Sequence, residues 1–539
     1  MLKAWISETI VGLAREMRLS YLPPLMVYLA AGISGLTAIV GTFFVKDYLG
    51  LSAAFLAGLT FWAGIPWALK MPMGHLVDLV WRWKAVLVYL GAGLIAASIL
   101  IMYGLIAHTQ AMAAVMAVEA WYVVSVLLAP TGYVLQDVVA DAMTVEAVPV
   151  ADENGEPFPE ARIKAMHTTM QTLGRFAIIS GLVAVASLNI FMFSEVALMT
   201  EAEKAAVYAD IYLLALAIPA LSVLGVILGG VTTRVRRRRM RRQGMSDAEI
   251  ARLMPGTAEA TEPNWWILGG GLAFAGFVLT LGLSDVPFSQ EVIFAGSMAI
   301  VLFLMQRLLL ELDRDVRRAL VGTAVIIFVF RAVPLPGPGA TWFEIDALGF
   351  DQKFLSVLSL IASGLALVGM VVLRPLMTRR SLAYIVALLT VAAGILSLPN
   401  IGLYYGVQNW TAPLTGGIVD ARFIAVIDTA IESPLGQVAM IPMLAWIAKN
   451  APSHLKATFF AVMASFTNLA LSASSLGTKY INQIFLVTRE VRDRATGALQ
   501  TPADYSELGW LLIAVALITF LAPLVAIWLV QHSPLRTEQ

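Results

Sequence analysis

Three acidic residues in one apolar stretch are the residues of this sequence best suited to exchange protons. Asp137 and Asp141 are four positions apart, so they share one face of a helix. Glu119 precedes Asp137 by eighteen positions, which is five full helical turns, and it falls on the same face. A carboxyl group that is buried beside another acid favours its neutral form, and it can then take up and release a proton. We therefore interpret Asp137, Asp141 and Glu119 as proton-coupling residues.

The same acids also have a structural interpretation. They lie near one end of the expected helix, where Arg82, Lys84 or Lys164 could pair with them. A charged side chain inside an apolar segment is costly, so it faces the interior of a helical bundle or water. The two interpretations differ in whether the carboxylates titrate.

Two arginines inside apolar stretches could bind an anion. Arg175 lies in the fifth apolar segment, and Arg331 lies near the end of the segment 319–333. A guanidinium group binds carboxylates through charge-assisted hydrogen bonds, which suits an organic anion in a central cavity. Gln171 and Asn468 could add neutral hydrogen bonds. We interpret these four residues as substrate-binding; arginines that pair only with buried acids, and amides that only join helices, are the alternative.

The composition places these residues in a membrane protein. Of 539 residues, 59% are apolar and 13% are charged, whereas about a quarter of a soluble domain is charged. Apolar runs of about 20 residues recur, each long enough to cross a hydrocarbon core of about 30 Å as a helix. The absence of cysteine excludes disulfides and thiolate metal sites. No phosphate-binding loop, metal cluster or nucleophile–base arrangement stands out, so we expect no enzyme, cofactor or metal.

Fourteen apolar segments are candidate membrane spans. They group as six, two and six along the chain. The segments are Leu22–Phe44, Ser52–Leu69, Ala85–Ala107, Met112–Ala140, Met166–Phe193, Ile211–Gly230, Trp265–Leu283, Val292–Leu310, Ala319–Val333, Lys353–Leu373, Leu382–Ile401, Phe423–Ala448, Ala457–Ile484 and Leu508–Val530.

A repeat divides these segments into two halves. Thr42–Leu59 and Thr341–Leu358 are 299 residues apart and identical at eight of eighteen positions. A repeat at half the chain length is typical of two similar helical bundles, although chance similarity between two helix corners is the alternative. We predict an all-α polytopic protein with two six-helix bundles and two extra helices inserted between them. The expected order is residues 1–21 (amphipathic segment), 22–231 (first bundle), 232–264 (basic loop), 265–312 (inserted helices), 313–531 (second bundle) and 532–539 (tail).

Lysines and arginines are concentrated in alternate connections, which predicts the orientation. The central connection has seven arginines in the nine positions from Arg234 to Arg242. With the basic connections in the cytoplasm, both termini are cytoplasmic, as expected in a bacterial inner membrane. A patch for nucleic acid or anionic lipid is the other interpretation of the arginine cluster. We adopt the topology signal and expect no nucleic-acid partner.

A glycine–aspartate motif follows the second span. Gly74-x-Leu76-x-Asp78 precedes Arg82 and Lys84. Gly74 permits a tight turn, and Asp78 can pair with a basic residue in one conformation and release it in another. The motif resembles the signature of the major facilitator superfamily in this connection. We therefore predict a conformational gate formed by Gly74, Asp78, Arg82 and Lys84.

A second acidic pair lies in the span 423–448. Asp428 and Glu432 repeat the four-residue spacing, but they lie near the outer end of their span. Asp137 and Asp141 lie near the inner end of theirs. We therefore interpret them as a candidate outer gate and not as a second copy of the proton site.

Three stretches resemble the folate–biopterin transporter family within that superfamily. The resemblance covers both halves but not Trp265–Leu310, and the basic residue that usually follows the fourth-span glutamate is missing after Glu146. The residues that carry it are Phe43-Phe44…Asp47-x-Leu49-Gly50-Leu51-Ser52 with Pro66-Trp67…Lys70-x-Pro72; Asp137-Val138-Val139-Ala140-Asp141-Ala142…Val145-Glu146; and Pro442-Met443…Lys456-Ala457-Thr458-Phe459-Phe460-Ala461…Ser465-x-x-Asn468.

The resemblance implies a secondary transporter that works by alternating access. Its implied cargo is a folate, a pterin or a similar organic anion, moved most simply by proton symport. The alternative is a non-transporting membrane factor for assembly or pigment carriage, whose inserted helices at 265–312 dock a membrane-protein partner.

Overall fold

The computed structural model describes most of the chain as helices. The described residues are 17–49, 51–68, 70–80, 83–149, 156, 158–247, 249–250, 265–282, 286–310, 313–372, 381–436, 456–492 and 499–536. Within these ranges nine helices are long and apolar enough to cross a membrane: Leu19–Lys46, Lys84–Ala107, Val118–Asp141, Leu173–Met192, Glu201–Arg242, Ser289–Gln306, Gln352–Gly369, Leu382–Tyr404 and Leu508–Gln531. The prediction of a polytopic helical membrane protein is confirmed. The presence of fourteen membrane spans stays a prediction.

The helices of the first half precede two connecting helices and the helices of the second half. The first half consists of α2 (Leu22–Gly32), η2 (Ile33–Thr37), α3 (Ala38–Tyr48), α4 (Ala53–Ala68), α5 (Lys70–Leu79), α6 (Lys84–Ala107), α7 (Thr109–Val115), α8 (Val118–Ala147), α9 (Glu160–Met192), α10 (Glu201–Ala215) and α11 (Ala217–Arg242). The connecting helices are α13 (Trp265–Gly282) and α14 (Ser289–Leu309).

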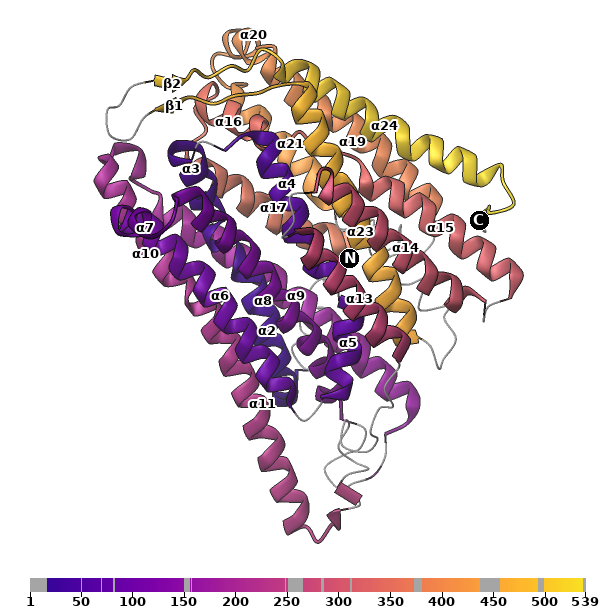
Figure 1. The fold of residues 1–539 in the computed structure, drawn as a ribbon. Coiled ribbons are helices and arrows are strands. Elements are labelled where there is room, and N and C mark those ends of the chain that lie inside the picture. Colours follow the sequence, from indigo (N-terminus) through magenta and orange to yellow (C-terminus); the bar gives the residue numbers. More distant parts are fainter. Residues whose placement is uncertain are drawn as a thin grey trace.

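The second half contains α15 (Arg314–Ala332), α16 (Pro338–Asp346), α17 (Gln352–Val372), α19 (Leu382–Tyr404), α20 (Gln408–Leu414), α21 (Ala421–Gly436), α23 (Lys456–Ile484) and α24 (Leu508–Gln531). A two-stranded antiparallel ribbon, β1 (Val491–Arg492) and β2 (Leu499–Thr501), lies between α23 and α24 in the chain. Figure 1 places this ribbon and α16 at one end of the bundles, and the last turns of α11 at the other end. We name these the α16 end and the α11 end.

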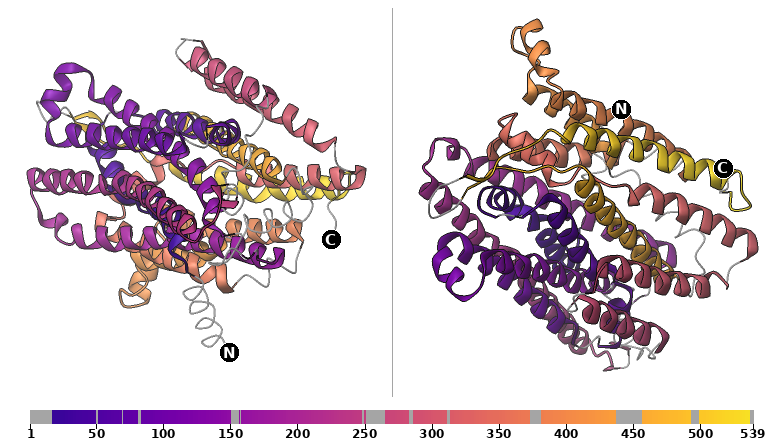
Figure 2. Two further views of the ribbon diagram at one scale, coloured as in Figure 1. Left: turned by 90° about the horizontal axis from the view of Figure 1, so that it is seen from below. Right: turned by 45° about the horizontal axis from the view of Figure 1, so that its top comes forward.

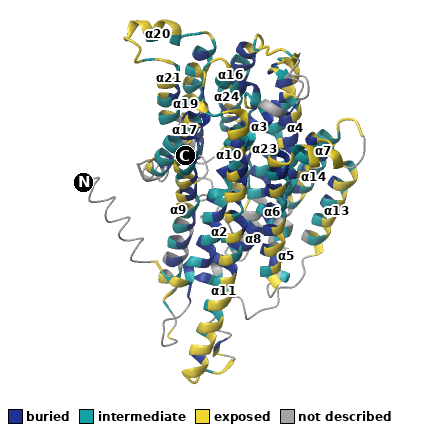
Figure 3. Ribbon diagram, turned by 90° about the vertical axis from the view of Figure 1, so that its left-hand side faces the viewer, coloured by how far each residue is buried: buried dark blue, intermediate teal, exposed yellow. Residues whose placement is uncertain are grey.

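The two halves lie side by side and meet chiefly through two pairs of helices. Figure 2 shows the first half in indigo and purple beside the second half in orange and yellow. Helix α4 packs against α23, and α9 packs against α17. Phe61 and Ile65 of α4 belong to the same buried core as Phe466 and Leu469 of α23. Figure 3 shows the buried residues concentrated along the middle of the bundle, with exposed stretches at α20 and at the projecting part of α11.

The repeat forms the same local structure twice. In the first copy α3 ends at Tyr48 and α4 begins at Ala53; in the second, α16 ends at Asp346 and α17 begins at Gln352. Gly349 has a φ of +67°, a conformation that glycine adopts without strain. Both copies are therefore a helix, a short turn and a second helix, as the sequence predicted.

Both first spans are interrupted. The 3₁₀ turn η2 separates α2 from α3, and residues 333–337 separate α15 from α16. Helix α23 binds the second interruption: Ser474 donates to the carbonyl of Val333 at 2.6 Å, and Thr478 accepts from the amide of Leu335 at 2.9 Å. Irregular backbone is tolerated at membrane depth where protein or a cavity satisfies its polar groups.

Helix α14 contacts both halves. The Gln290 amide donates to the carbonyl of Gly58 in α4 at 3.2 Å and accepts from Lys479 of α23 at 3.0 Å. Glu291 forms a 2.8 Å ion pair with Lys479 and accepts a 2.5 Å hydrogen bond from Tyr480. Helix α13 packs against α14 and α5. These contacts place the two connecting helices beside the α4–α23 pair.

Close glycine contacts join α6 to α8. A Cβ atom on Gly132 would lie 2.5 Å from the carbonyl oxygen of Gly91, and one on Gly91 would lie 2.6 Å from the carbonyl oxygen of Gly132. Small residues permit this approach of two backbones inside a membrane. Gly93 lies on the same helix, and a Cβ atom placed on it would meet nothing within 4 Å.

These contacts predict different effects for two similar substitutions. Gly91→Ala should lower the free energy of unfolding by about 1–3 kcal/mol, because α6 and α8 must separate to admit the methyl group. Gly93→Ala is the matched control, and it should leave stability unchanged. The measurement is the unfolding midpoint of each purified variant in mixed detergent micelles. Equal midpoints for the two variants would contradict the close packing.

Candidate functional site

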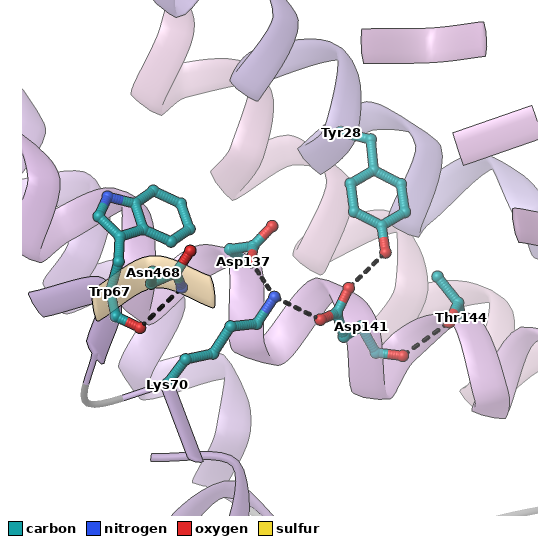
Figure 4. A network of polar contacts seen from close by, with 7 residues as sticks. All are labelled: Tyr28, Trp67, Lys70, Asp137, Asp141, Thr144 and Asn468. Carbon is teal, nitrogen blue, oxygen red and sulfur yellow. Dashed lines mark hydrogen bonds and ion pairs between the residues drawn. The ribbon is translucent and has the colours of Figure 1, made fainter. Parts of the chain in front are cut away.

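A partly buried charged cluster joins three helices of the first half, in which the side chains of Lys70, Asp137 and Asp141 are 24%, 22% and 48% exposed. The ammonium group of Lys70, from α5, lies 2.5 Å from Asp137 and 2.8 Å from Asp141, both from α8. The hydroxyl of Tyr28, from α2, donates to Asp141 at 2.7 Å. Figure 4 shows the Lys70 ammonium between the two carboxylates, with Tyr28 on the far side of Asp141. We name Tyr28, Lys70, Asp137 and Asp141 the charged cluster.

A second cation, the exposed Arg175, lies near the charged cluster. Lys70 supplies one positive charge to two carboxylates, which leaves one negative charge. Arg175 of α9 interacts electrostatically with both Asp137 and Tyr28. Arg175 reaches this region because Gly174 allows α9 to approach the ring of Tyr28, whose Cε2 lies 2.8 Å from a Cβ placed on that glycine. Together the two acids and two cations have no net charge.

The predicted proton-coupling residues do not all meet. Asp137 and Asp141 share a face of α8, as expected, and bind one common cation. That cation is Lys70, whereas Lys84 instead pairs with Glu146 at 2.5 Å. Glu119 is an exposed residue in the first turn of α8, about 27 Å along the helix axis from Asp137.

The predicted substrate-binding residues are dispersed. Arg175 adjoins the charged cluster, whereas Arg331 lies in the last turn of α15. The Asn468 amide donates to the carbonyl of Trp67 at 3.1 Å, which links α23 to α4. This contact between helices is the alternative role that the sequence left open for Asn468. Gln171 lies in α9, and its side chain is outside the described structure.

The expected turn at Gly74 is wrong. Helix α5 runs from Lys70 to Leu79, so Gly74 and Asp78 are both helical, and the turn follows at Val80. Glycine allows a turn without requiring one, so Gly74 is compatible with a continuous helix. Arg82 lies outside the described residues. The helix brings Lys70, which the gate motif did not include, under α8.

The candidate outer gate in α21 is described in part. Asp428 is 7% exposed and accepts a 3.1 Å hydrogen bond from the Asn400 amide of α19. It also interacts electrostatically with Glu344 of α16. The side chain of Glu432 lies outside the described structure. Asp428 thus faces its own half, toward α16 and α19.

A cavity of about 780 Å³ lies between the first half and the interruption before α16. Its walls come from η2, α3, α4, α6, α8, α10 and α11, and residues 335–342 cover one side. Its hydroxyl-bearing residues are Ser34, Thr37, Thr42, Thr60, Ser98, Tyr122, Ser125, Tyr133, Tyr212 and Thr341. Of the predicted substrate-binding residues whose side chains the structure describes, none lines this cavity.

One face of α8 connects the cavity to the charged cluster. Ala129 and Tyr133 line the cavity, and Asp137 and Asp141 follow on the same face at intervals of four residues. One helical turn, about 6 Å of rise, therefore separates the cavity wall from the first carboxylate. This continuity makes the cavity and the charged cluster one candidate site.

Contacts between the two copies of the repeat close the α16 end. Lys46 at the end of α3 forms a 2.5 Å ion pair with Asp346 at the end of α16. Asp346 also accepts a 2.5 Å hydrogen bond from Tyr505. Burial and this carboxylate raise the pKa of the Tyr505 phenol, so the phenol stays protonated and donates at neutral pH. We name Lys46, Asp346 and Tyr505 the latch.

A buried arginine supports the latch. Arg489 is 3% exposed, donates to the carbonyl of Val45 in the first half, and lies 5.2 Å from the ring centre of Trp342 in the second half. The sequence predicted no role for Arg489.

Comparisons with known proteins agree on fold and family. A folate-biopterin transporter of Synechocystis sp. (strain ATCC 27184 / PCC 6803 / Kazusa) is 27% identical over 146 residues, and the match spans 27% of this chain and 28% of that relative. A crystal structure of a POT family transporter in complex with 5-aminolevulinic acid has a TM-score of 0.60 at 13% identity, covering 96% of each chain. A crystal structure of a mutant of the nucleoside transporter NupG has a TM-score of 0.53 at 11% identity, covering 95% of this chain and 99% of that one.

The family match extends over most of the chain. The model of the BT1 family matches residues 168–538. The resemblance to folate–biopterin transporters is confirmed, and the solved structures show that the chain shares the fold of these transporters. Because the matched residues are more than half of the sequence, this multi-pass membrane protein belongs to the BT1 family.

Proposed function

We propose that the protein is a secondary active transporter that works by alternating access. The proposed cargo is a folate-like, pterin-like or other organic anion, taken up with protons across a bacterial inner membrane, with both termini in the cytoplasm. The observation that carries the proposal is the charged cluster, which lies partly buried one helical turn from a cavity that both halves line. The family relationship and the folate-biopterin transporter relative support the class of cargo.

The latch supports alternating access. It links the two halves at the α16 end, and with cytoplasmic termini this end faces outward. Lys46 belongs to the first half and Asp346 to the second, so the ion pair must break when the halves separate there.

The charge balance of the cluster supports proton coupling. Two carboxylates compete for the ammonium group of Lys70 in an apolar interior, where an unpaired charge is costly. Protonation of Asp141 would leave Lys70 paired with Asp137 alone and weaken the link between α5 and α8. Proton uptake and helix movement are therefore linked through one cation.

Removal of one carboxylate should abolish proton coupling but leave substrate exchange intact. Asp141→Asn in proteoliposomes should abolish uphill uptake of a folate driven by a proton gradient, while exchange of folate across the membrane persists. The amide cannot titrate but keeps the shape of the side chain. Asp247→Asn is the matched control, because Asp247 is an exposed acid paired with Arg241. Undiminished uphill uptake by Asp141→Asn would refute the proton assignment.

Disruption of the latch should expose the cavity from the outer side. The chain has no cysteine, so Thr341→Cys places a single thiol on the cavity wall. Adding Asp346→Asn should accelerate its reaction with an external, membrane-impermeant maleimide by about twofold to fivefold, because a partly exposed ion pair contributes up to about 1 kcal/mol. Labelling is measured in right-side-out vesicles.

A charge exchange and a second ion pair control the latch experiment. Combining Lys46→Asp with Asp346→Lys should restore slow labelling. Asp351→Asn, which breaks the exposed pair with Arg422, should leave the rate unchanged. The latch assignment fails if Asp346→Asn labels no faster than the parent.

A further inference from the structure

We propose that the cavity binds an uncharged, hydrogen-bonding ring and excludes ionised groups. The inference rests on the proposed function and specifies which part of a cargo the cavity holds. An organic anion whose charge lies on a side chain at a distance from the ring would place its neutral ring in the cavity and its ionised group outside it, whereas a carboxylate attached directly to the ring would have to enter the cavity. The charge and chemistry of the cavity wall carry the inference.

The cavity wall has hydroxyl groups but no formal charge. Every residue that lines the cavity in the described structure is neutral, and ten of them carry a hydroxyl group. A hydroxyl both donates and accepts, so this wall can bind either kind of polar edge on a ring. Apolar side chains such as Ile95, Ile99 and Trp342 supply the surface for its faces. A volume of about 780 Å³ is in the range that small-molecule sites occupy.

Two of the hydroxyl groups are held in fixed positions by each other. The phenol groups of Tyr133 and Tyr212 lie near Ser34 and Thr37 of η2. Ser98 and Ser125 lie 2.9 Å apart across α6 and α8. A wall whose rotamers are fixed before binding loses little conformational entropy when a ligand binds.

The neighbouring charges offer no surplus to an ionised ligand. An ion moved from water into this cavity would need a partner of opposite charge. Lys70 already contacts two carboxylates, and Arg175, an exposed residue of α9, interacts electrostatically with Asp137. By formal count the two acids and two cations at the α11 end of the cavity are neutral, so they offer no surplus counter-charge to an anion or a cation.

The ring is enclosed by both halves. Residues 335–342 cover the cavity, and Asn482 of α23 donates to the carbonyl of Pro336 at 3.1 Å. Gly337 in this segment has a φ of +80°, and a Cβ there would lie 2.8 Å from Nδ2 of Asn482. A ligand in the cavity thus contacts the first half directly and the second half through this segment.

Matched pairs of neutral and charged ligands test whether the cavity excludes ionised groups. The purified full chain in lipid nanodiscs is titrated with pterin and pterin-6-carboxylate, and with adenosine and AMP, by isothermal calorimetry. The neutral member of at least one pair should bind, and should bind at least about tenfold more tightly than its charged partner. Using two ring systems separates the effect of charge from that of ring identity. The proposal is overturned if no neutral member binds, or if the charged members bind as tightly.

Substitutions in the wall locate the binding. Tyr133→Phe and Tyr212→Phe each remove one hydroxyl and should weaken binding of the neutral ligand by about fivefold, the effect of one hydrogen bond. Tyr89→Phe is the control, since Tyr89 is 43% exposed on α6 and does not line the cavity. Equal affinities for all three variants would place the ligand elsewhere.

An added charge should reverse the preference. Ala129→Lys places an ammonium group on the α8 wall, and it should make pterin-6-carboxylate bind more tightly than pterin. Thermal unfolding of each variant confirms that it is folded, and an unfolded variant is replaced by Thr60→Lys on the α4 wall. An unchanged preference in a folded lysine variant would also refute the proposal. Because binding is measured at equilibrium without a proton gradient, failure of proton coupling leaves these results interpretable.

Discussion

The cost of burying charge in an apolar bundle governs this structure. The side chains of Lys70 and Asp137 are largely withdrawn from water, so each of them favours a partner of opposite charge, and the half-exposed Asp141 completes the pairing. The cluster fixes the position of α5 beneath α8, and Tyr28 adds α2 to the same set. Three helices are thereby placed relative to one another by four side chains. A change in the protonation of one acid therefore alters contacts that hold all three helices together.

The charged cluster was predictable in part. The spacing of Asp137 and Asp141 was sufficient to place both on one face, because helical periodicity is a local property. Their partner was not predictable in the same way, since Lys70 lies in another helix and its proximity depends on packing. The motif around Gly74 also favoured a turn, and it therefore predicted Arg82 and Lys84 as the basic partners. A helix that continues to Leu79 instead brings Lys70 to the acids.

The division into two halves was predictable from the sequence, but the contacts between the halves were not. The repeat at Thr42 and Thr341 correctly predicted matching helix–turn–helix segments, because eight identical positions preserve the same helix ends. The latch between them was not visible: the position equivalent to Lys46 is Ile345, so the ion pair is not itself repeated. The cavity was hidden for a different reason. Its hydroxyl groups come one or two at a time from many helices, and no single segment is rich enough in them to be recognised.

Gln290 joins the two halves through a single side chain. Its amide nitrogen binds the backbone of α4 while its amide oxygen binds Lys479 of α23, so the two donor–acceptor distances report on two different helices. If α4 and α23 slide past each other, both bonds cannot keep their geometry. The carbonyl stretching frequency of this one amide, isolated by isotope labelling, is therefore a built-in spectroscopic reporter of the relative position of the two bundles.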